Sequence, residues 1–420
     1  MSYIGSFEKY IGKVFDFRLL LSLLKDGRKN PVISIQNIFL GYFLGSMLRI
    51  AQTSRMEEEI REGVLRKRVK PMSHDTVGYG LKHLDLESVR EIWYRIGKKA
   101  KRNGMMRRPE FYDMTVASLD GIETYSSFKR KSADCLTRRV RKKKGKKKVT
   151  AIQYYRKIVV LSILGRDFSM PLDLEIMRRG EDESACALRL LKRVCDKLGK
   201  RFLDIVVCDA AYCTPNFFQK CENLGVHAAA VLKENQKNLL ETAEEQMKKS
   251  KPVENCNLDT AKEKTQLFDL PAVYWHTAEK DVRVVWAKRK VYKREEYELE
   301  GRRERVYCWV DKTNVVAFHK DIDLPVEILY SIGRHRWDID AQLFMEMTKH
   351  RHLKHKSHTC EKAYPVMLAI RLITYFIFMC FYRRHINSRR RVKIKTALEM
   401  VRRIKRAANE NLEPAIIFLE

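Results

Sequence analysis

The sequence predicts an α/β fold with helical regions at both ends of the chain. The most informative part is the run of residues 202–235, where an apolar strand, Phe202–Cys208, ends on a single carboxylate, Asp209. A helical stretch follows, and a second apolar strand, Ala228–Leu232, then ends on Lys233. This pattern is a β-α-β unit. Open α/β sheets build their sites at the carboxyl ends of such strands, so Asp209 is a candidate site residue.

The length of 420 residues is too great for one ordinary domain and suggests two or three. An apolar fraction of 45% is enough for real cores and excludes a disordered chain. The N-terminal part could be a DNA-contacting domain, and its short helix-turn patterns also fit a plain helical bundle. We expect a helical N-terminal region (1–110), the first part of an α/β core (111–235), a β-rich insertion (236–330), the remainder of the core (331–385) and a basic C-terminal helical segment (386–420).

The first part of the core contains a second strand that ends on an acid. Thr115–Leu119 reads as this strand, and Asp120 follows it directly. Two further strands are expected at Ile158–Leu164 and Pro171–Ile176. A helix with one apolar face is expected at Glu183–Leu198.

The β-rich insertion contains three stretches with alternating or β-branched and aromatic residues, separated by long charged segments. The expected strands are Ala272–Trp275, Val282–Lys288 and Arg305–Trp309. Their tryptophans, Trp275, Trp286 and Trp309, could stack on a base extruded from DNA. Each tryptophan taken alone is more typical of a core residue.

Beyond residue 331 the chain returns to helix. The run Pro365–Tyr382 is apolar over 18 residues but carries Arg371, which makes it marginal for a membrane span. Charged segments flank this run. We therefore expect it to form a buried helix in the core of a large soluble domain. No N-terminal signal peptide is evident.

The formal net charge is +31, from 84 basic and 53 acidic residues. Such an excess causes self-repulsion and favours a polyanionic partner, with nucleic acid first and a plain basic surface as the alternative. Residues 129–148 concentrate the charge, because they hold 12 Lys or Arg and the single acid Asp134. We expect a flexible basic loop here that contacts a phosphate backbone. Its central lysines are Lys142, Lys143 and Lys144.

The ten cysteines lie at irregular spacings and form no C-x-x-C pair. This argues against a zinc site and favours a reduced, intracellular protein.

Three acids stand out as candidate ligands: Asp120, Asp209 and Asp340. The ends of adjacent strands can bring the first two within a few ångströms, where their carboxylates would repel each other unless a cation lay between them. Hard oxygen ligands suit Mg²⁺ or Mn²⁺. Two such ions about 4 Å apart would activate a water and stabilise the leaving oxygen in phosphodiester cleavage.

The third acid lies in the run RHRWDIDAQLFMEMTKH at 334–350. If this run is helical, Arg336, Trp337, Asp340 and Phe344 share a face, with the two aromatic residues as anchors. Arg336 could then pair with a carboxylate or a phosphate. The rival acids, near the opposite face, are Asp338 and Glu346.

Three segments together resemble the acid-bearing motifs of bacterial cut-and-paste DDE transposases, and most of all the IS-four-like insertion-sequence enzymes. They are SLDGIET (118–124), VVCDAAYCTPNFFQKCENLGVHAAAVLKEN (206–235) and RHRWDIDAQLF (334–344). The gaps of 89 and 131 residues between the acids suit that family, and 171–193 resembles its intervening segment. The resemblance covers roughly residues 110–385.

The resemblance implies an RNase H-like mixed-sheet catalytic core, interrupted by the β-rich insertion. It implies that Asp120, Asp209 and Asp340 bind two Mg²⁺ ions, for which Mn²⁺ can substitute. The activity implied is cleavage of DNA at the element's terminal inverted repeats, followed by attack of the 3′-hydroxyl on target DNA. The implied partners are double-stranded DNA and a second copy of the chain, in the cytoplasm with the nucleoid. Arg336, Lys233 and Lys349 are the DNA contacts expected besides the basic loop. For Lys233 a structural salt bridge is an equal alternative.

The sequence departs from the family at three positions. The family has glutamate where this chain has Asp340, tyrosine at the position of Gly333 and lysine at the position of Met347. The nearest substitutes in sequence are Tyr330, Lys349 and His350. Two alternatives therefore stay open: a decayed or domesticated DNA-binding protein of the same fold, and a related nuclease that cannot join ends.

Overall fold

The structure is a computed structural model of the 420-residue chain. It describes residues 3–129, 135–144, 147–254, 258–299, 302–355, 360–386 and 396–410. Within these ranges the side chains of residues 142–148, 296–305 and 385–386 are outside the description. The protein is of mixed α/β class.

The chain forms two compact units. The first comprises Met1–Arg107, Asp120–Leu198 and Asp338–Glu420, and the second comprises Arg108–Leu119 and Gly199–Trp337. Strand β1 (Val116–Ser127) begins in the second unit and continues in the first.

The first unit is mainly helical. Its helices before the sheet are α1 (Tyr3–Phe15), α2 (Phe17–Leu21), α3 (Ile35–Met47), α4 (Thr53–Arg61), α5 (His74–His83) and α6 (Leu86–Arg102). Its later helices are α7 (Glu183–Leu198), the π-helix η5 (Ile339–Phe344), α11 (Met345–His350), α12 (Ala363–Ile386) and α13 (Ala397–Asn409). Several begin at side-chain caps, since Ser34, Ser73 and Asp85 each accept a hydrogen bond from the third backbone N–H that follows.

Helix α12 is the core helix of the first unit and packs against α3, α5, α6 and β4. Of the helices that the structure describes, the stretch Ala363–Arg384 alone is long and apolar enough to cross a membrane, and it is almost entirely buried inside the protein. Its Arg371 is 4% exposed and donates to the carbonyl of His352 at 2.9 Å, so the charge is satisfied within the fold. The prediction of a buried helix over Pro365–Tyr382 is therefore confirmed.

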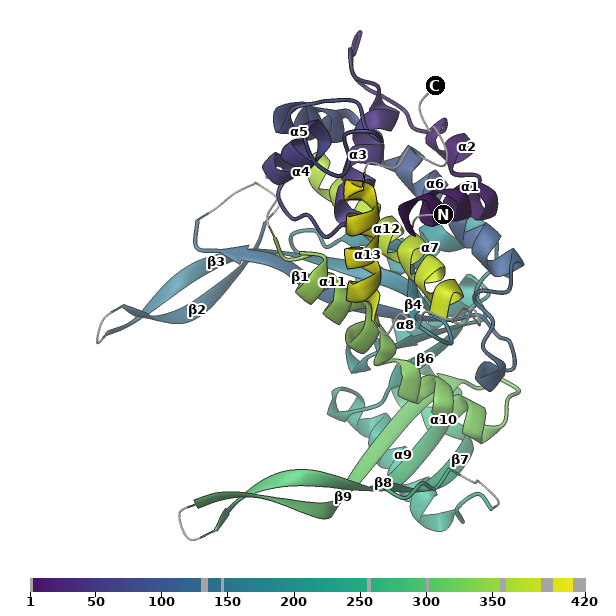
Figure 1. Ribbon diagram of the computed structural model, residues 1–420. Helices are drawn as coiled ribbons and strands as arrows, with labels where there is room; N and C mark the ends of the chain where they lie inside the picture. Colours follow the sequence, from purple (N-terminus) through teal and green to yellow (C-terminus); the bar gives the residue numbers. More distant parts are fainter. Residues whose placement is uncertain are drawn as a thin grey trace. The chain divides into compact units, whose positions relative to one another are not determined.

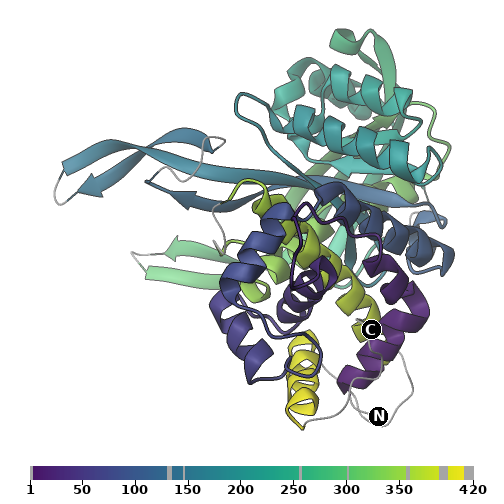
Figure 2. The ribbon, with the colours of Figure 1, turned by 90° about the horizontal axis from the view of Figure 1, so that it is seen from above.

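The first unit's strands pair in the order β2-β3-β1, and β4 (Ser169–Ile176) pairs with β3 (Lys147–Leu164). Strand β2 (Leu136–Lys144) is antiparallel to β3, from the pair Leu136 with Tyr155 to the pair Lys144 with Lys147. Together they project as a two-stranded arm (Figures 1 and 2). The expectation of a loop over 129–148 is wrong for residues 136–144 and 147–148, because their backbones pair as the antiparallel strands β2 and β3. The backbone of Lys142, Lys143 and Lys144 belongs to β2, and their side chains lie outside the described residues.

A buried ionic network ties the helices of the first unit to its sheet. Asp173 of β4 is fully buried, and its carboxylate accepts from Arg90 at 3.2 Å and from Arg193 at 2.9 Å. The hydroxyl of Tyr94 donates to the same carboxylate. Arg90 and Tyr94 belong to α6 and Arg193 to α7, so one acid joins two helices and one strand.

The second unit is a sheet with helices on it. Its strands run in the order β1-β5-β6-β9-β8-β7. Their bounds are β5 (Ile205–Cys208), β6 (His227–Val231), β7 (Glu263–Trp275), β8 (Lys280–Leu299) and β9 (Arg302–His319). The β1, β5 and β6 pairs are parallel, and the remaining pairs are antiparallel. The helices are α8 (Pro215–Asn223), α9 (Lys237–Lys249) and α10 (Val326–His335).

The β-α-β unit predicted from residues 202–235 is present as β5, α8 and β6. Thr214 caps α8 by accepting from the backbone N–H of Phe217 at 3.3 Å, and Pro215 is its first residue. Gly225 follows the helix with φ +71°, which glycine adopts without strain.

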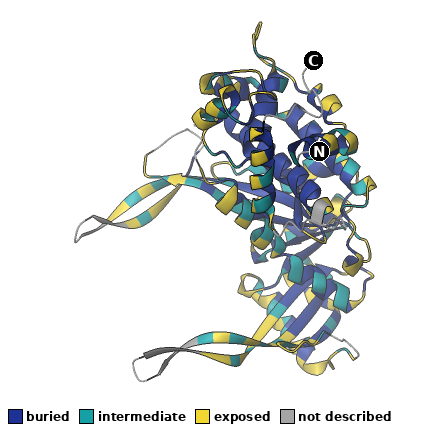
Figure 3. Cartoon of the chain, viewed as in Figure 1, coloured by how far each residue is buried: buried dark blue, intermediate teal, exposed yellow. Residues whose placement is uncertain are grey.

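The β-rich region continues the second unit's sheet, since β9 pairs with β6. The three expected strands lie inside β7, β8 and β9. Beyond β7, strands β8 and β9 extend as a second arm, whose residues alternate between exposed and half-buried (Figure 3). Trp275 and Trp286 are core residues, at 1% and 7% exposed, whereas Trp309 lies on this arm and is 45% exposed.

Candidate functional site

The register of two parallel strands fixes the places of the first two candidate acids along the chain. Leu119 at the end of the second unit's part of β1 pairs with Cys208, the last residue of β5. Asp120 is the residue after Leu119, and Asp209 is the residue after Cys208. Each acid therefore directly follows one member of the Leu119–Cys208 pair, at the carboxyl end of its paired strand segment. This is the position at which open α/β sheets carry their sites.

The two acids differ in their immediate surroundings. The Asp120 carboxylate accepts from the backbone N–H of Gly121 at 2.7 Å, which orients one of its oxygens. The Asp209 carboxylate is 40% exposed and lies 3.8 Å from the ammonium of Lys233, which is 60% exposed. Both partners of that ion pair face solvent, so it holds them only weakly and can be exchanged for a stronger ligand.

The segment that leads to Asp340 is attached to β1 within the second unit. The hydroxyl of Ser118 donates to the carbonyl of Arg336 at 3.5 Å. Ser118 lies two residues before Asp120, and Arg336 lies four residues before Asp340. This contact links the β1 strand and the third-acid segment at a point close in sequence to both carboxylates.

Asp340 lies in the π-helix η5 and is half-buried. Within the first unit η5 packs against β4 and continues into α11. The expected helix over 333–350 is thus interrupted, first by a turn at Arg336 and Trp337 and then by the π-helical turn. Short π-helical turns are rare and occur often at functional sites, because the extra residue redirects the side chains that follow.

The aromatic neighbours of Asp340 do not share one role. Phe344 is 5% exposed and anchors η5 as expected. Trp337 is 57% exposed, so its expected role as an anchor is wrong. Arg336 is buried in its place, at 1% exposed. Its guanidinium carbon lies 4.1 Å from the centroid of the Trp337 ring, so the two side chains stack.

The rival acid Glu346 has a structural role. Its carboxylate lies 2.6 Å from Arg49 and 3.5 Å from Arg351, and it joins α11 to the N-terminal helices of the first unit. Met347, at the position of the family's lysine, is fully buried. Lys349, by contrast, is exposed on α11. The other substitute expected from the sequence, His350, is exposed as well.

Gly333 has a physical reason to lack a side chain. A Cβ at this position of α10 would lie 2.9 Å from Cγ2 of Val316 in β9. Helix and strand approach each other so closely that a tyrosine, which the resembled family has here, would not fit.

The second unit contains a cavity of about 1000 Å³ beside Asp209. Its lining includes Lys233, Trp286, Arg289, Arg334 and Trp337. The buried indole N–H of Trp286 has no hydrogen-bond partner among the described residues. An unpaired buried donor at a cavity wall favours a ligand with an acceptor atom.

Two of the cavity's arginines share one carboxylate that sequence reasoning missed. Glu263 accepts from Arg289 at 2.7 Å and from Arg334 at 2.8 Å. The hydrogen bond from Arg289, followed by the charge of Arg334, holds the pKa of the Glu263 carboxyl below its usual value. One negative charge between two positive ones leaves a net positive charge in this cluster. No local signal marks it, because its members come from β7, β8 and α10.

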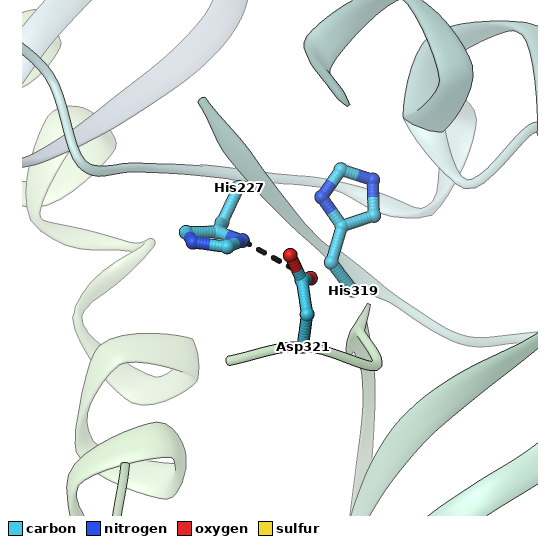
Figure 4. A group of neighbouring side chains, drawn as sticks. All are labelled: His227, His319 and Asp321. Carbon is cyan, nitrogen blue, oxygen red and sulfur yellow. Dashed lines mark ion pairs between the residues drawn. The ribbon is translucent and has the colours of Figure 1, made fainter. Parts of the chain in front are cut away.

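A separate group of His227, His319 and Asp321 has potential metal-binding atoms within 4.8 Å of one another (Figure 4). His227 lies 3.4 Å from Asp321. Both nitrogens of His319 are engaged, since Nδ1 accepts from the N–H of Ala228 at 3.1 Å and Nε2 lies 3.1 Å from the carbonyl of Phe218. Burial, and next the charge of Lys280, lower the pKa of His319 to about 4. This histidine therefore serves as a neutral link between β6, β9 and α8.

The chain was compared with protein families, curated proteins and solved structures. No protein-family model and no curated protein matches it. Among solved structures, it is similar to a piggyBac transposase in a synaptic complex with hairpin DNA, at 11% identity and a TM-score of 0.41. That likeness covers 98% of this chain and 80% of the other. A likeness so distant assigns neither fold family nor function.

Proposed function

We propose that this protein is a DNA transposase of the DDE type with an RNase H-like core, similar to the IS-four-like insertion-sequence enzymes. The observation that carries the proposal is the parallel pair of Leu119 with Cys208, after which Asp120 and Asp209 follow directly. The core topology supports it, because β1, β5 and β6 are parallel and α7 connects β4 to β5. The Ser118–Arg336 contact and the π-helical turn at Asp340 also support it.

Asp120, Asp209 and Asp340 are proposed to hold two Mg²⁺ ions, for which Mn²⁺ can substitute. The donor set fits, since three carboxylates supply the hard oxygen ligands that these ions prefer. The exposed, loosely paired carboxylate of Asp209 fits as well, because it can exchange Lys233 for a cation. Bound ions supply activation of water and stabilisation of the leaving oxygen. The side chain of Asp340 is one methylene shorter than that of glutamate. The π-helical backbone of η5 is proposed to compensate for this shorter reach by bringing the carboxylate closer to the ions.

The chain's own residues position the DNA. In the first step a water attacks a phosphodiester at the element end, forms one P–O bond, breaks another and leaves a 3′-hydroxyl. In the second step that hydroxyl attacks a target phosphodiester, so one P–O bond again replaces another. Neither step requires a covalent bond to the protein. Lys233, released from Asp209, and Lys349 on α11 would contact phosphates, together with Lys142, Lys143 and Lys144 of β2.

The roles proposed for Arg336 and for the tryptophans differ from those expected from the sequence. Arg336 is buried under Trp337, and we assign it a positioning role through its carbonyl's bond with Ser118. An extruded base is best placed in the cavity beside Asp209, where Trp286 contributes its unpaired N–H and Trp337 an exposed ring. The proposed partners are element-end and target duplexes and a second copy of the chain, in the cytoplasm with the nucleoid.

A catalytically inactive DNA-binding protein of the same fold is the second candidate. The observations that favour it are the aspartate at position 340 and the buried methionine at position 347. A nuclease that cannot join ends is separated from a transposase by a strand-transfer assay.

The test is Mg²⁺-dependent cutting of DNA that carries the element's ends. Asp120→Asn, Asp209→Asn and Asp340→Asn should each reduce cutting by about 100-fold or more, because each removes a metal ligand. Asp311→Asn, an equal charge change at an exposed position of β9, is the control and should cut as the parent does. Normal cutting by all three variants would refute the proposed site. Tight DNA binding by a parent that never cuts would favour the inactive alternative.

A further inference from the structure

The arm formed by β2 and β3 has two chemically different faces. Side chains alternate between the faces of a two-stranded ribbon, and the paired residues share a face. One face carries Thr137 and Arg139 of β2 opposite Tyr154 and Ile152 of β3. We call this the arginine face. The other face carries Arg138 opposite Gln153.

On the second face the arginine is neutralised. The guanidinium of Arg138 donates to both carboxylate oxygens of Glu123, at 2.9 and 3.0 Å, and to the amide oxygen of Gln153 at 2.7 Å. This bidentate geometry fixes the group and satisfies most of its donors. Arg138 therefore contributes little unpaired charge to the second face.

The arginine face borders a hollow of about 470 Å³. The lining also includes Arg138, whose guanidinium is paired with Glu123, and Arg179, which precedes α7 in a distant part of the chain. Thr137 and Tyr154 add two hydroxyl groups. The described residues that line the hollow include no carboxylate.

Neither Arg139 nor Arg179 has an ion-pair or hydrogen-bond partner in the part of the chain that the structure describes. Arg179 is presented by an ordered turn, in which Glu181 accepts from the backbone N–H of Arg178 at 2.9 Å. Gly180 in this turn has φ +79°, a conformation suited to glycine. The anchored turn holds the second guanidinium at the hollow.

We propose that this hollow binds a phosphate of the DNA backbone, with Arg139 and Arg179 as its charged donors and Thr137 and Tyr154 as hydroxyl donors. In the described part of the chain these two guanidinium groups have no counter-charge, and an anion between them would relieve their mutual repulsion. A phosphodiester accepts hydrogen bonds from guanidinium and hydroxyl groups at once. A backbone phosphate is favoured over a free anion because the hollow is continuous with the basic arm, which can follow a duplex. This inference rests on the DNA-binding part of the proposed function.

The test is the salt dependence of duplex binding, measured by fluorescence anisotropy without a divalent metal. The double variant Arg139→Ala, Arg179→Ala should lower the slope of log affinity against log salt by about one unit. Arg139→Lys with Arg179→Lys should restore the slope, because lysine retains the point charge. The control is Arg95→Ala, which removes a charge already paired with Glu91 on α6 and should leave the slope unchanged.

Three outcomes would overturn the inference. They are an unchanged slope in the alanine double variant, an equal loss in Arg95→Ala, and competition by inorganic phosphate at an ionic strength where chloride has no effect. The last would identify the ligand as a free anion. Failure of this inference is distinct from failure of the proposed function, because the catalytic variants are tested by cutting and these by binding. A melting temperature equal to that of the parent shows that each variant is folded.

Discussion

At the scale of single residues, the ionic contacts of the second unit fall into two classes. Glu263 is fixed by two arginines, and the resulting cluster shapes the cavity wall. The side chains of Asp209 and Lys233 are 40% and 60% exposed and lie 3.8 Å apart, so their attraction is small in water. A residue that is to bind a cation must not be committed to a strong partner. Asp209 meets this requirement, and Glu263 does not.

His319 should make the stability of the protein depend on pH. Its pKa of about 4 in the folded chain lies below the unfolded value of about 6.5, so the unfolded state binds more protons between these values. The stabilisation is fully present above pH 6.5 and is lost as the pH falls toward 4, by up to about 3 kcal/mol. The measurement is the free energy of unfolding of parent and His319→Gln at several pH values.

The glutamine variant retains a neutral acceptor and donor for Ala228 and Phe218 but cannot be protonated. We expect the parent to lose stability more steeply than the variant between pH 6.5 and 4. Parallel pH profiles would show that His319 does not titrate differently on folding.

The positions of single residues could be predicted from the sequence where a local pattern of apolar and charged residues defined them. An apolar run followed by an acid marked Asp120 and Asp209, and the structure places both directly after one rung of a parallel pair. The exposure of Trp337 could not be predicted, since it depends on Arg336 occupying the buried place. The role of Glu346 could not be predicted either, because its partner Arg49 is 297 residues away.

At the scale of elements, the β2–β3 arm shows that charge density is a poor indicator of disorder. Its lysines and arginines suggested a loop, but the backbone pairing is continuous from Leu136 to Lys144. A π-helical turn such as η5 also has no reliable sequence signal, because its extra residue is accommodated by packing. By contrast, the apolar strand ends, the capped helix α8 and the buried helix α12 followed from local patterns.

The elements of the first unit should depend strongly on Asp173. Asp173→Asn keeps the shape of the side chain but leaves Arg90 and Arg193 without their buried counter-charge. We expect the free energy of unfolding to fall by about 3–5 kcal/mol, measured by urea denaturation. Asp196→Asn on α7 is the control, because its pair with Lys192 is exposed and should contribute less than about 1 kcal/mol. Equal effects of the two changes would show that the buried network is not a stabilising link.

At the scale of the whole molecule, the sequence indicated the α/β class and the β-rich region but not how that region is attached. Its attachment depends on the pairing of β9 with β6, between residues almost 90 positions apart in the chain. Contacts of this range leave no periodic trace in the sequence. The division of the chain into five domain segments stays a prediction. Binding of a second copy of the chain and binding of Mg²⁺ also stay predictions.

The net charge of +31 has a consequence for the intact protein. Counter-ion release should dominate its association with duplex DNA, so affinity should fall steeply as salt rises. The measurement is anisotropy of one duplex with the element ends and one unrelated duplex across a salt series. We expect the same steep fall for both, with tighter binding of the element ends at every salt concentration. Binding that is insensitive to salt would exclude a phosphate-based interaction.

The central claim is that Asp120, Asp209 and Asp340 bind the same pair of divalent ions. Its most direct test is a Mn²⁺ titration of the protein–DNA complex, followed by electron paramagnetic resonance. The account predicts two bound ions per chain in the parent and a loss of at least one in each aspartate-to-asparagine variant. Equal Mn²⁺ binding by the parent and all three variants would contradict it.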